Sequence, residues 1–305
     1  MFRSRLASLL LFICTTTACA RQSWPEPPAV DPAAYQKEYD TWRQQQQEGV
    51  GSILAIVGIW PLTEGDNPFG SDASLPIVLP ASVAPSNAGV LRRQGEKVTV
   101  VPAPRSPLRL ADGKAVTAPT EYTEGMAIGS VSLIVEGMPG GRLFVTGFDE
   151  AHPALKQPPT VDAFAPDTRW RVAARFDPFD TPRTVKVSDV RGGTVDFTAT
   201  GQLVFRLADR EWRLTAFDSG PDEPFFVMFK DQTNGKSTYG GYRILSPTRV
   251  KPREFTVLDF NMAMNPPCAY SPYTTCPLPP PENRLDIAVE AGLKRLPSVR
   301  GFEKS

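Results

Sequence analysis

The chain has 305 residues, of which 41% are hydrophobic and 22% charged, so it is long enough for one large globular domain or two smaller ones. Its 33 basic and 33 acidic side chains cancel, and this balance gives no overall field that would attract nucleic acid. The 32 prolines are about twice the usual share of roughly 5%, which favours rigid, non-helical connections over long helices. We therefore expect a folded protein without a nucleic-acid partner.

The N-terminus has the pattern of an export signal. Residues 1–19 combine two early arginines with the short apolar run Leu6–Ile13, which is too short to span a bilayer. The residues that end at Cys19 resemble a bacterial lipobox, whereas Ala18–Ala20 also fits an ordinary signal-peptidase site. We expect a periplasmic protein with a lipid on Cys19 as its only membrane contact, and a proline-rich tether over residues 20–34. The alternative is a cleaved, freely soluble periplasmic protein.

A helix is predicted after the tether. Asp31 suits an N-cap and is followed by proline at the first helical position. The helix should run to about Gln47, because Gly49 and Gly51 follow. One face carries three aromatic side chains, Tyr35, Tyr39 and Trp42, which we expect to pack on a sheet; a sugar-stacking platform is the less favoured alternative.

Short apolar or alternating runs between turn residues then predict an all-β body of mainly antiparallel, sandwich-like or barrel-like sheets. Tight hairpins are expected at Ala208-Asp209 and at Arg191-Gly192-Gly193. The proline-rich stretch 149–168 is the expected connection between an N-terminal unit, 35–148, with the helix, and a C-terminal unit, 169–305. The expected strands are Ile53–Trp60, Ile77–Leu79, Gly89–Arg93, Lys97–Val101, Ser130–Val135, Arg142–Thr146, Arg169–Phe176, Thr184–Val190, Thr194–Thr198, Gln202–Leu207, Glu211–Phe217, Phe225–Lys230, Thr238–Leu245 and Glu254–Asn261.

A second helix is predicted near the C-terminus. Asn283 suits an N-cap, and Asp286 follows three residues later. Apolar residues recur at helical spacing as far as Leu296, and Lys294 and Arg295 suit a helix C-terminus. We therefore expect a helix over Asn283–Leu296.

The segment Asp259–Asn283 between the last strand and this helix is rich in proline and contains two cysteines. Only Cys268 and Cys276 remain once the N-terminal segment is set aside, and in an exported protein such a pair predicts a disulfide. A zinc site is the alternative, but it needs further soft ligands and the chain has the single histidine His152. We expect neither a metal nor a cofactor.

The C-terminal third also carries a set of longer motifs. These are Phe229–Gly235, Thr238–Arg243, Asp259–Asn261, Asn265–Cys268 and Cys276–Leu285, with Gly65–Asn67 and Phe69–Asp72 upstream. With these motifs the chain resembles the domain-of-unknown-function family numbered 1684, which implies a β-rich body with this proline and cysteine segment but no settled activity. Met262 and Met264 stand where members usually have Arg and Tyr, so a charged ligand of relatives could be altered or lost here.

Asp259 is the carboxylate that most needs a partner. Strand alternation places it at the end of an internal strand, and a buried carboxylate must be paired or hydrogen-bonded. We expect Arg243, on the preceding strand, to neutralise it. Asp259 is then either half of a structural ion pair, the favoured interpretation, or a general acid or base with a shifted pKa.

These residues lead to two functional hypotheses. The first is a binding protein for an unknown small molecule or envelope component, with a site around the Asp259–Asn283 segment. The second is a hydrolase that uses Asp259 and Glu282 as acid and base; whether the protein is an enzyme stays open. Ser-His-Asp, phosphate-loop and dinucleotide motifs are not found. The candidate ligand-binding residues are Asp231, Tyr239, Arg243, Asp259, Asn261, Asn265, Tyr270 and Glu282.

Overall fold

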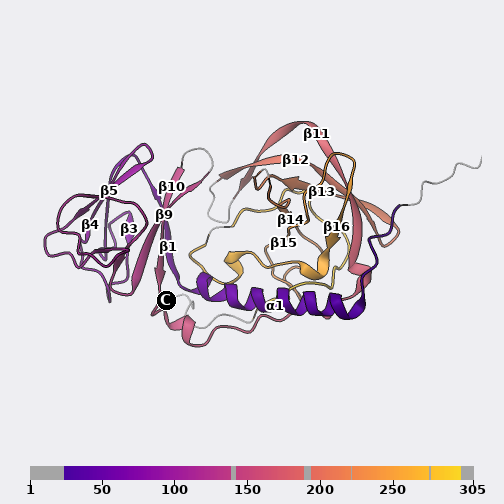
Figure 1. Cartoon of the computed structure of the whole chain (residues 1–305), viewed down its shortest axis with the longest axis horizontal. Coiled ribbons are helices and arrows are strands. Elements are labelled where there is room, and N and C mark those ends of the chain that lie inside the picture. The colour runs from indigo at the N-terminus through magenta and orange to yellow at the C-terminus, as the bar shows by residue number, and fades with distance from the viewer. Residues whose placement is uncertain (1–23, 139–141, 189–193, 221, 275, 297–305) are drawn as a thin grey trace, which may run out of the picture.

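The computed structural model describes residues 24–138, 142–188, 194–220, 222–274 and 276–296. The protein is mostly β, with 42% of residues in strands, and the sheets are antiparallel apart from one short parallel pair. Figure 1 shows two β units side by side, with β1 to β10 in one and β11 to β16 in the other. The helix α1 runs along the second unit and leads into β1 of the first. The expected β-rich fold is confirmed.

The helix α1 spans Pro32–Leu54 and starts as predicted. The side chain of Asp31 accepts a hydrogen bond from the Ala34 N–H at 2.8 Å. The predicted end near Gln47 is wrong, because the helix continues through both glycines to Leu54. Val50 and Leu54 are buried, and their packing offsets a cost of about 1 kcal/mol for each glycine in a helix. The first strand consequently begins at Ile56 rather than Ile53.

The first unit contains two five-stranded sheets around one apolar core. Their orders are β1-β10-β9-β8-β6 and β3-β2-β4-β5-β7. Strands β2, β6, β7 and β8 are absent from the sequence-based prediction, and all but β2 are only two or three residues long. The strands are β1 (Ile56–Leu62), β2 (Gly65–Gly70), β3 (Ile77–Val78), β4 (Gly89–Gln94), β5 (Lys97–Pro102), β6 (Arg109–Leu110), β7 (Thr120–Glu121), β8 (Met126–Ile128), β9 (Val131–Met138) and β10 (Arg142–Asp149).

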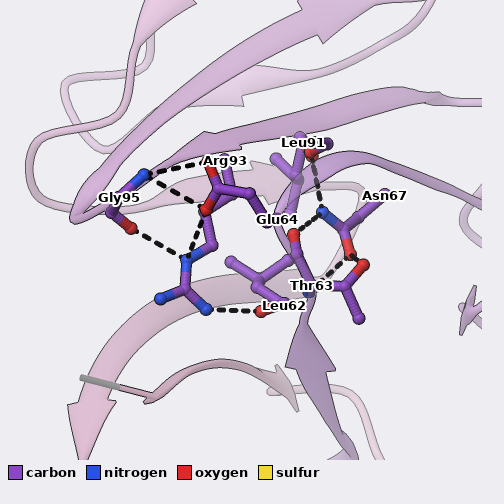
Figure 2. Close-up of polar contacts among 8 residues, drawn as sticks. Leu62, Thr63, Glu64, Asn67, Leu91, Arg93 and Gly95 are labelled. Carbon is purple, nitrogen blue, oxygen red and sulfur yellow. Dashed lines mark hydrogen bonds and ion pairs between the residues drawn. The ribbon is translucent and has the colours of Figure 1, made fainter. Parts of the chain in front are cut away.

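Strand β2 reads like a turn in the sequence, and a buried asparagine explains why it is a strand. Asn67 is 2% exposed; its amide oxygen accepts from the N–H and hydroxyl of Thr63, both at 2.9 Å. Its amide nitrogen donates to the carbonyls of Thr63 and Leu91 (Figure 2). Arg93 beside it donates to the Leu62 carbonyl at 2.7 Å. These bonds fix the bend between β1 and β2, so the motif Gly65–Asn67 has a structural role here.

The second unit is one continuous run of strands. Its four-stranded sheet has the order β13-β12-β11-β16, and the pair β14-β15 joins it through Phe217 and Phe226, which exchange backbone hydrogen bonds. The spatial order is therefore β16-β11-β12-β13-β14-β15, an open barrel around an aromatic core. The strands are β11 (Arg171–Ser188), β12 (Thr194–Leu207), β13 (Arg210–Phe217), β14 (Val227–Phe229), β15 (Arg243–Leu245) and β16 (Phe255–Asp259).

Two long strands replace four predicted ones. Strand β11 continues through a bulge between Pro178 and Arg183, and β12 continues through Ala199–Gly201 opposite that bulge. The sequence predicts a break at both places. The predicted hairpin turn at Ala208-Asp209 is confirmed, since both residues have positive φ, 52° and 57°. The predicted turn at Arg191-Gly192-Gly193 lies outside the described residues. The remaining elements are four 3-10 helices, η1 (Pro153–Lys156), η2 (Thr168–Trp170), η3 (Phe260–Met262) and η4 (Pro267–Ala269).

The predicted helix over Asn283–Leu296 is wrong, because these residues form an extended, irregular segment. Apart from the Ala291 N–H, which donates to the Val289 carbonyl at 2.9 Å, its backbone groups bond mainly to other parts of the chain. Leu285 N–H donates to the Lys230 carbonyl at 2.8 Å, and Leu293 N–H donates to the Ala263 carbonyl at 2.9 Å. Of the apolar side chains that suggested a helix, Leu285, Val289 and Leu293 are buried in the barrel core and beside α1, whereas Ala288 is exposed.

The predicted export signal and the Cys19 lipidation site lie outside the described residues. Within the part of the chain that the structure describes, no helix is long and apolar enough to cross a membrane.

Candidate functional site

The proline-rich segment after β16 is closed by the predicted disulfide. Cys268 and Cys276 are bonded, with their Cα atoms 5.9 Å apart. The hydroxyl of Tyr239 donates to the Cys268 carbonyl at 3.2 Å, so this candidate ligand-binding residue holds the segment in place. Tyr270 is 5% exposed and packs beside α1. The disulfide is confirmed, and both tyrosines serve the packing of this segment.

Arg243 does not pair with Asp259, and this hypothesis is wrong. Its guanidinium lies 2.6 Å from Asp231, and neither side chain is exposed to solvent. The reason is strand order: β15 pairs with β14, which ends just before Asp231, whereas β16 lies at the opposite edge of the barrel sheet. Burial lowers the pKa of Arg243 and Asp231 opposes that shift, but a guanidinium stays protonated in proteins.

This buried pair fastens the C-terminal segment to the barrel. Arg243 donates to the carbonyls of Val289, at 2.9 Å, and Ala291. Asp231 accepts from the Val289 N–H at 3.2 Å and from the hydroxyl of Thr233 at 2.6 Å. Asp231 and Arg243 are therefore structural in this conformation, where no ligand could reach them.

Asp259 belongs to a different cluster at the end of β16. It accepts from the Tyr35 hydroxyl at 2.7 Å and from Arg171 Nε at 3.2 Å. The N–H and side-chain amide of Asn261 also donate to it, each at 3.0 Å. Burial, with a smaller contribution from Asp259, raises the pKa of Tyr35, so this phenol is the donor. The carboxylate is held by four donors.

Tyr35 and Arg171 were not among the predicted site residues. Tyr35 lies on the aromatic stripe that we assigned to packing alone, and 224 residues separate it from Asp259. Arg171 faces Asp259 directly across the β11–β16 ladder. The sequence has no distinctive signal for Arg171, because Arg169 and Arg175 occur in the same predicted strand.

A hollow of about 340 Å³ opens beside this cluster. It is lined by residues of α1, of β16 and of the segment that follows β15, at the seam between the first and last strands of the barrel. We call it the seam hollow. It is lined by Glu38, Trp42, Arg171, Leu245, Ser246, Pro247, Thr248, Val257, Leu258, Asp259, Met262 and Met264.

The lining of the seam hollow combines apolar side chains with charged and polar ones. Met262 and Met264 belong to the predicted Asp259–Asn283 segment and are half-buried, as is Trp42. Arg171 uses Nε for Asp259 and Nη1 for the Pro28 carbonyl, at 3.1 Å. Its Nη2 donates no hydrogen bond to a described residue, so the guanidinium that lines the hollow keeps one unused donor.

A larger hollow, of about 1120 Å³, opens under the N-terminal segment on the other side of Arg171. The extended residues 24–30 form one of its walls, held by the Trp24 indole, which donates to the Ala173 carbonyl at 2.9 Å. Because strands and helices position a site more firmly than an extended segment does, we regard the seam hollow as the better candidate.

The two carboxylates of the hydrolase hypothesis are not brought into contact. Glu282 is exposed and makes no hydrogen bond or ion pair with a described residue, and all polar contacts of Asp259 go to other groups. Asn265 is buried and donates to the Lys294 carbonyl at 3.0 Å. Among the described residues, no group of three or more His, Cys, Asp or Glu side chains is placed to hold a metal ion.

The fold and site define a class of β-rich proteins with an open barrel and a disulfide-closed, proline-rich segment. Residues 157–294 match the model of the family described as "Protein of unknown function (DUF1684)". The chain belongs to that family. No curated protein matches the chain.

Among solved structures, the chain is similar to the solution NMR structure of the uncharacterized protein from gene locus rrnAC0354 of Haloarcula marismortui. The two share 35% sequence identity over 46% of this chain and 78% of that one, with a TM-score of 0.39.

Proposed function

We propose that this protein binds a ligand in the seam hollow. The observation that carries the proposal is an apolar wall of Met262, Met264 and Trp42 next to a guanidinium with an unused donor, Arg171 Nη2. Ligand sites combine these two elements, an apolar lining and a few placed polar groups, and begin at about 300 Å³. The ligand is therefore a group with an apolar body and a hydrogen-bond acceptor.

The methionines favour binding over catalysis. Thioether side chains are flexible and polarisable, so they adapt to the shape of an apolar partner. Asp259 is held by four donors, which suits a group that orients Arg171 rather than one that exchanges protons. The hydrolase hypothesis stays a prediction, since Asp259 and Glu282 make no contact here.

We further propose that the protein is exported and anchored through Cys19. Two independent features support this: the lipobox-like residues before Cys19, and the disulfide between Cys268 and Cys276, which persists in oxidising compartments. Incorporation of labelled palmitate into the wild-type protein, but not into Cys19→Ala, is the expected result. Equal labelling of both, or of neither, would contradict lipidation at Cys19.

The binding proposal is tested by closing the hollow. Thr248 is exposed and lines the hollow, so Thr248→Trp should fill it at little cost to folding, whereas Thr198→Trp places the same indole on an exposed site of β12. Thermal unfolding is followed with short peptides, fatty acids, sugars and nucleotides. A ligand at one hundred times its Kd should add about 2.7 kcal/mol to the wild type and to Thr198→Trp, but not to Thr248→Trp. A ligand that stabilises all three proteins equally would refute the site.

A further inference from the structure

Strand β16 has an unpaired edge that faces the seam hollow. The N–H of Phe176 on β11 donates to the Glu254 carbonyl at 2.9 Å, and the Phe176 carbonyl accepts from Arg253 N–H at 2.8 Å. Antiparallel strands alternate the direction of their backbone groups, so Thr256 and Leu258 direct theirs toward β11. Val257 lies between them and directs its N–H and carbonyl outward, where no described residue bonds to them.

The opposite wall of the hollow is an edge that is paired at Ile244 and unpaired at Ser246. Ile244 on β15 exchanges backbone hydrogen bonds with Met264, both at 2.9 Å, on the side of the seam. Pro247 accepts from Phe225 on the side of β14, at 3.0 Å. By the same alternation Ser246 directs its N–H and carbonyl into the seam, and within the described chain they have no partner.

We propose that the seam hollow receives an extended peptide segment of another protein, which adds as a strand between Val257 and Ser246. This inference rests on the proposed function and names its ligand class. Consecutive residues line both walls, 257–259 on one side and 245–248 on the other. Side chains of neighbouring strand residues point to opposite faces, so such runs present the backbone itself to the ligand.

The charge around the hollow specifies the peptide further. The charged lining residues are Arg171 (+1), Asp259 (−1) and Glu38 (−1), which sum to −1. Arg171 and Asp259 neutralise each other, whereas Glu38 is exposed and forms no ion pair with a described residue. The bound peptide of the other protein therefore has apolar side chains toward Met262 and Met264 and a basic side chain toward Glu38.

The probe is a fluorescent hexapeptide that alternates valine and threonine after an N-terminal lysine, with both ends capped. We expect saturable binding by fluorescence anisotropy and protection of the Val257 N–H from hydrogen exchange. The same peptide methylated on its valine backbone nitrogens should bind about tenfold more weakly or worse, since each net hydrogen bond is worth roughly one decade of affinity. Glu38→Gln should weaken the lysine peptide and leave a norleucine analogue unaffected.

The matched variants are Val257→Pro, which removes only the outward N–H of an edge strand, and Val257→Thr, which keeps it. The first should lose about tenfold in affinity and the second little. If Val257→Pro unfolds at a much lower temperature than the wild type, its affinity is not informative. Hydrogen exchange of the Val257 N–H in the wild type, with and without the peptide, then tests the inference. Equal affinity for the methylated peptide, or no protection, overturns the inference. If Thr248→Trp then blocks the binding of a non-peptide ligand, the proposed function stands although the peptide inference fails. If Thr248→Trp blocks no ligand at all, both the proposed function and the peptide inference are refuted.

Discussion

The buried pair of Asp231 and Arg243 makes the sharpest prediction about stability. Neither side chain is exposed, and Asp231 →Asn would leave the Arg243 guanidinium without a counter-charge in the barrel core. Removing one partner of a buried ion pair costs about 3–5 kcal/mol. At roughly 2–4 °C per kcal/mol for a unit of this size, the Tm should fall by about 6–20 °C. Thermal unfolding of the oxidised protein, followed by circular dichroism, measures this directly.

Two controls make the result specific. Asp66 forms an ion pair with Arg92 in which both side chains are about half exposed, so Asp66→Asn should leave the Tm nearly unchanged. The double variant Asp231→Leu with Arg243→Met should be more stable than Asp231→Asn, because it leaves no unpaired charge. An Asp231→Asn protein that melts within about 2 °C of the wild type would refute the idea that this pair holds the C-terminal segment.

Three further predictions concern single sites. Burial lowers the pKa of His152, so stability is full above the unfolded value of about 6.5 and declines as pH falls below it; His152→Gln should lack this decline in pH-dependent unfolding. Gly292 has φ 75°, and an added Cβ would lie 2.6 Å from the Ala263 carbonyl oxygen, so Gly292→Ala should cost at least about 1–3 kcal/mol in urea unfolding. Reducing the Cys268–Cys276 disulfide should cost about 2.5 kcal/mol and lower the Tm, as calorimetry with and without reductant would show.

Each of these has a contrary outcome. A His152→Gln protein with the same decline below about pH 6.5 would assign that decline to other groups. A Gly292→Ala protein of unchanged stability would mean that the segment shifts without cost. An unchanged Tm after verified reduction would show that the proline-rich segment is held by its other contacts alone.

What could be predicted from the sequence is local. The cap at Asp31 and the turn at Ala208-Asp209 depend on neighbouring residues, and both were correct. The disulfide followed from counting cysteines in a chain that we expect to be exported. Most strands were predicted correctly from short apolar or alternating runs of residues. The bulge that joins two such runs into β11 was not predicted, because it depends on the pairing with β12.

What was missed depends on distant partners. The apolar spacing of residues 283–296 suits a helix, but two hydrogen bonds between the Asn283 side chain and the Thr215 backbone, 68 residues away, and the bond from Arg243 to the Val289 carbonyl override it. Arg243 was assigned to Asp259 because their strands are close in sequence, whereas the barrel places these strands at opposite edges of the run. The sequence predicts a site around the Asp259–Asn283 segment, and the structure adds Arg171 and the seam hollow as candidates.

The position of α1 has a consequence for the order of events during synthesis. The helix is among the first parts of the folded chain to be made, yet its Tyr35 bonds to Asp259, which follows 224 residues later. At about 5–20 residues per second, roughly 11–45 s pass before that partner exists. For this interval the Tyr35 hydroxyl lacks its partner, so a factor that shields nascent apolar segments has a target in α1.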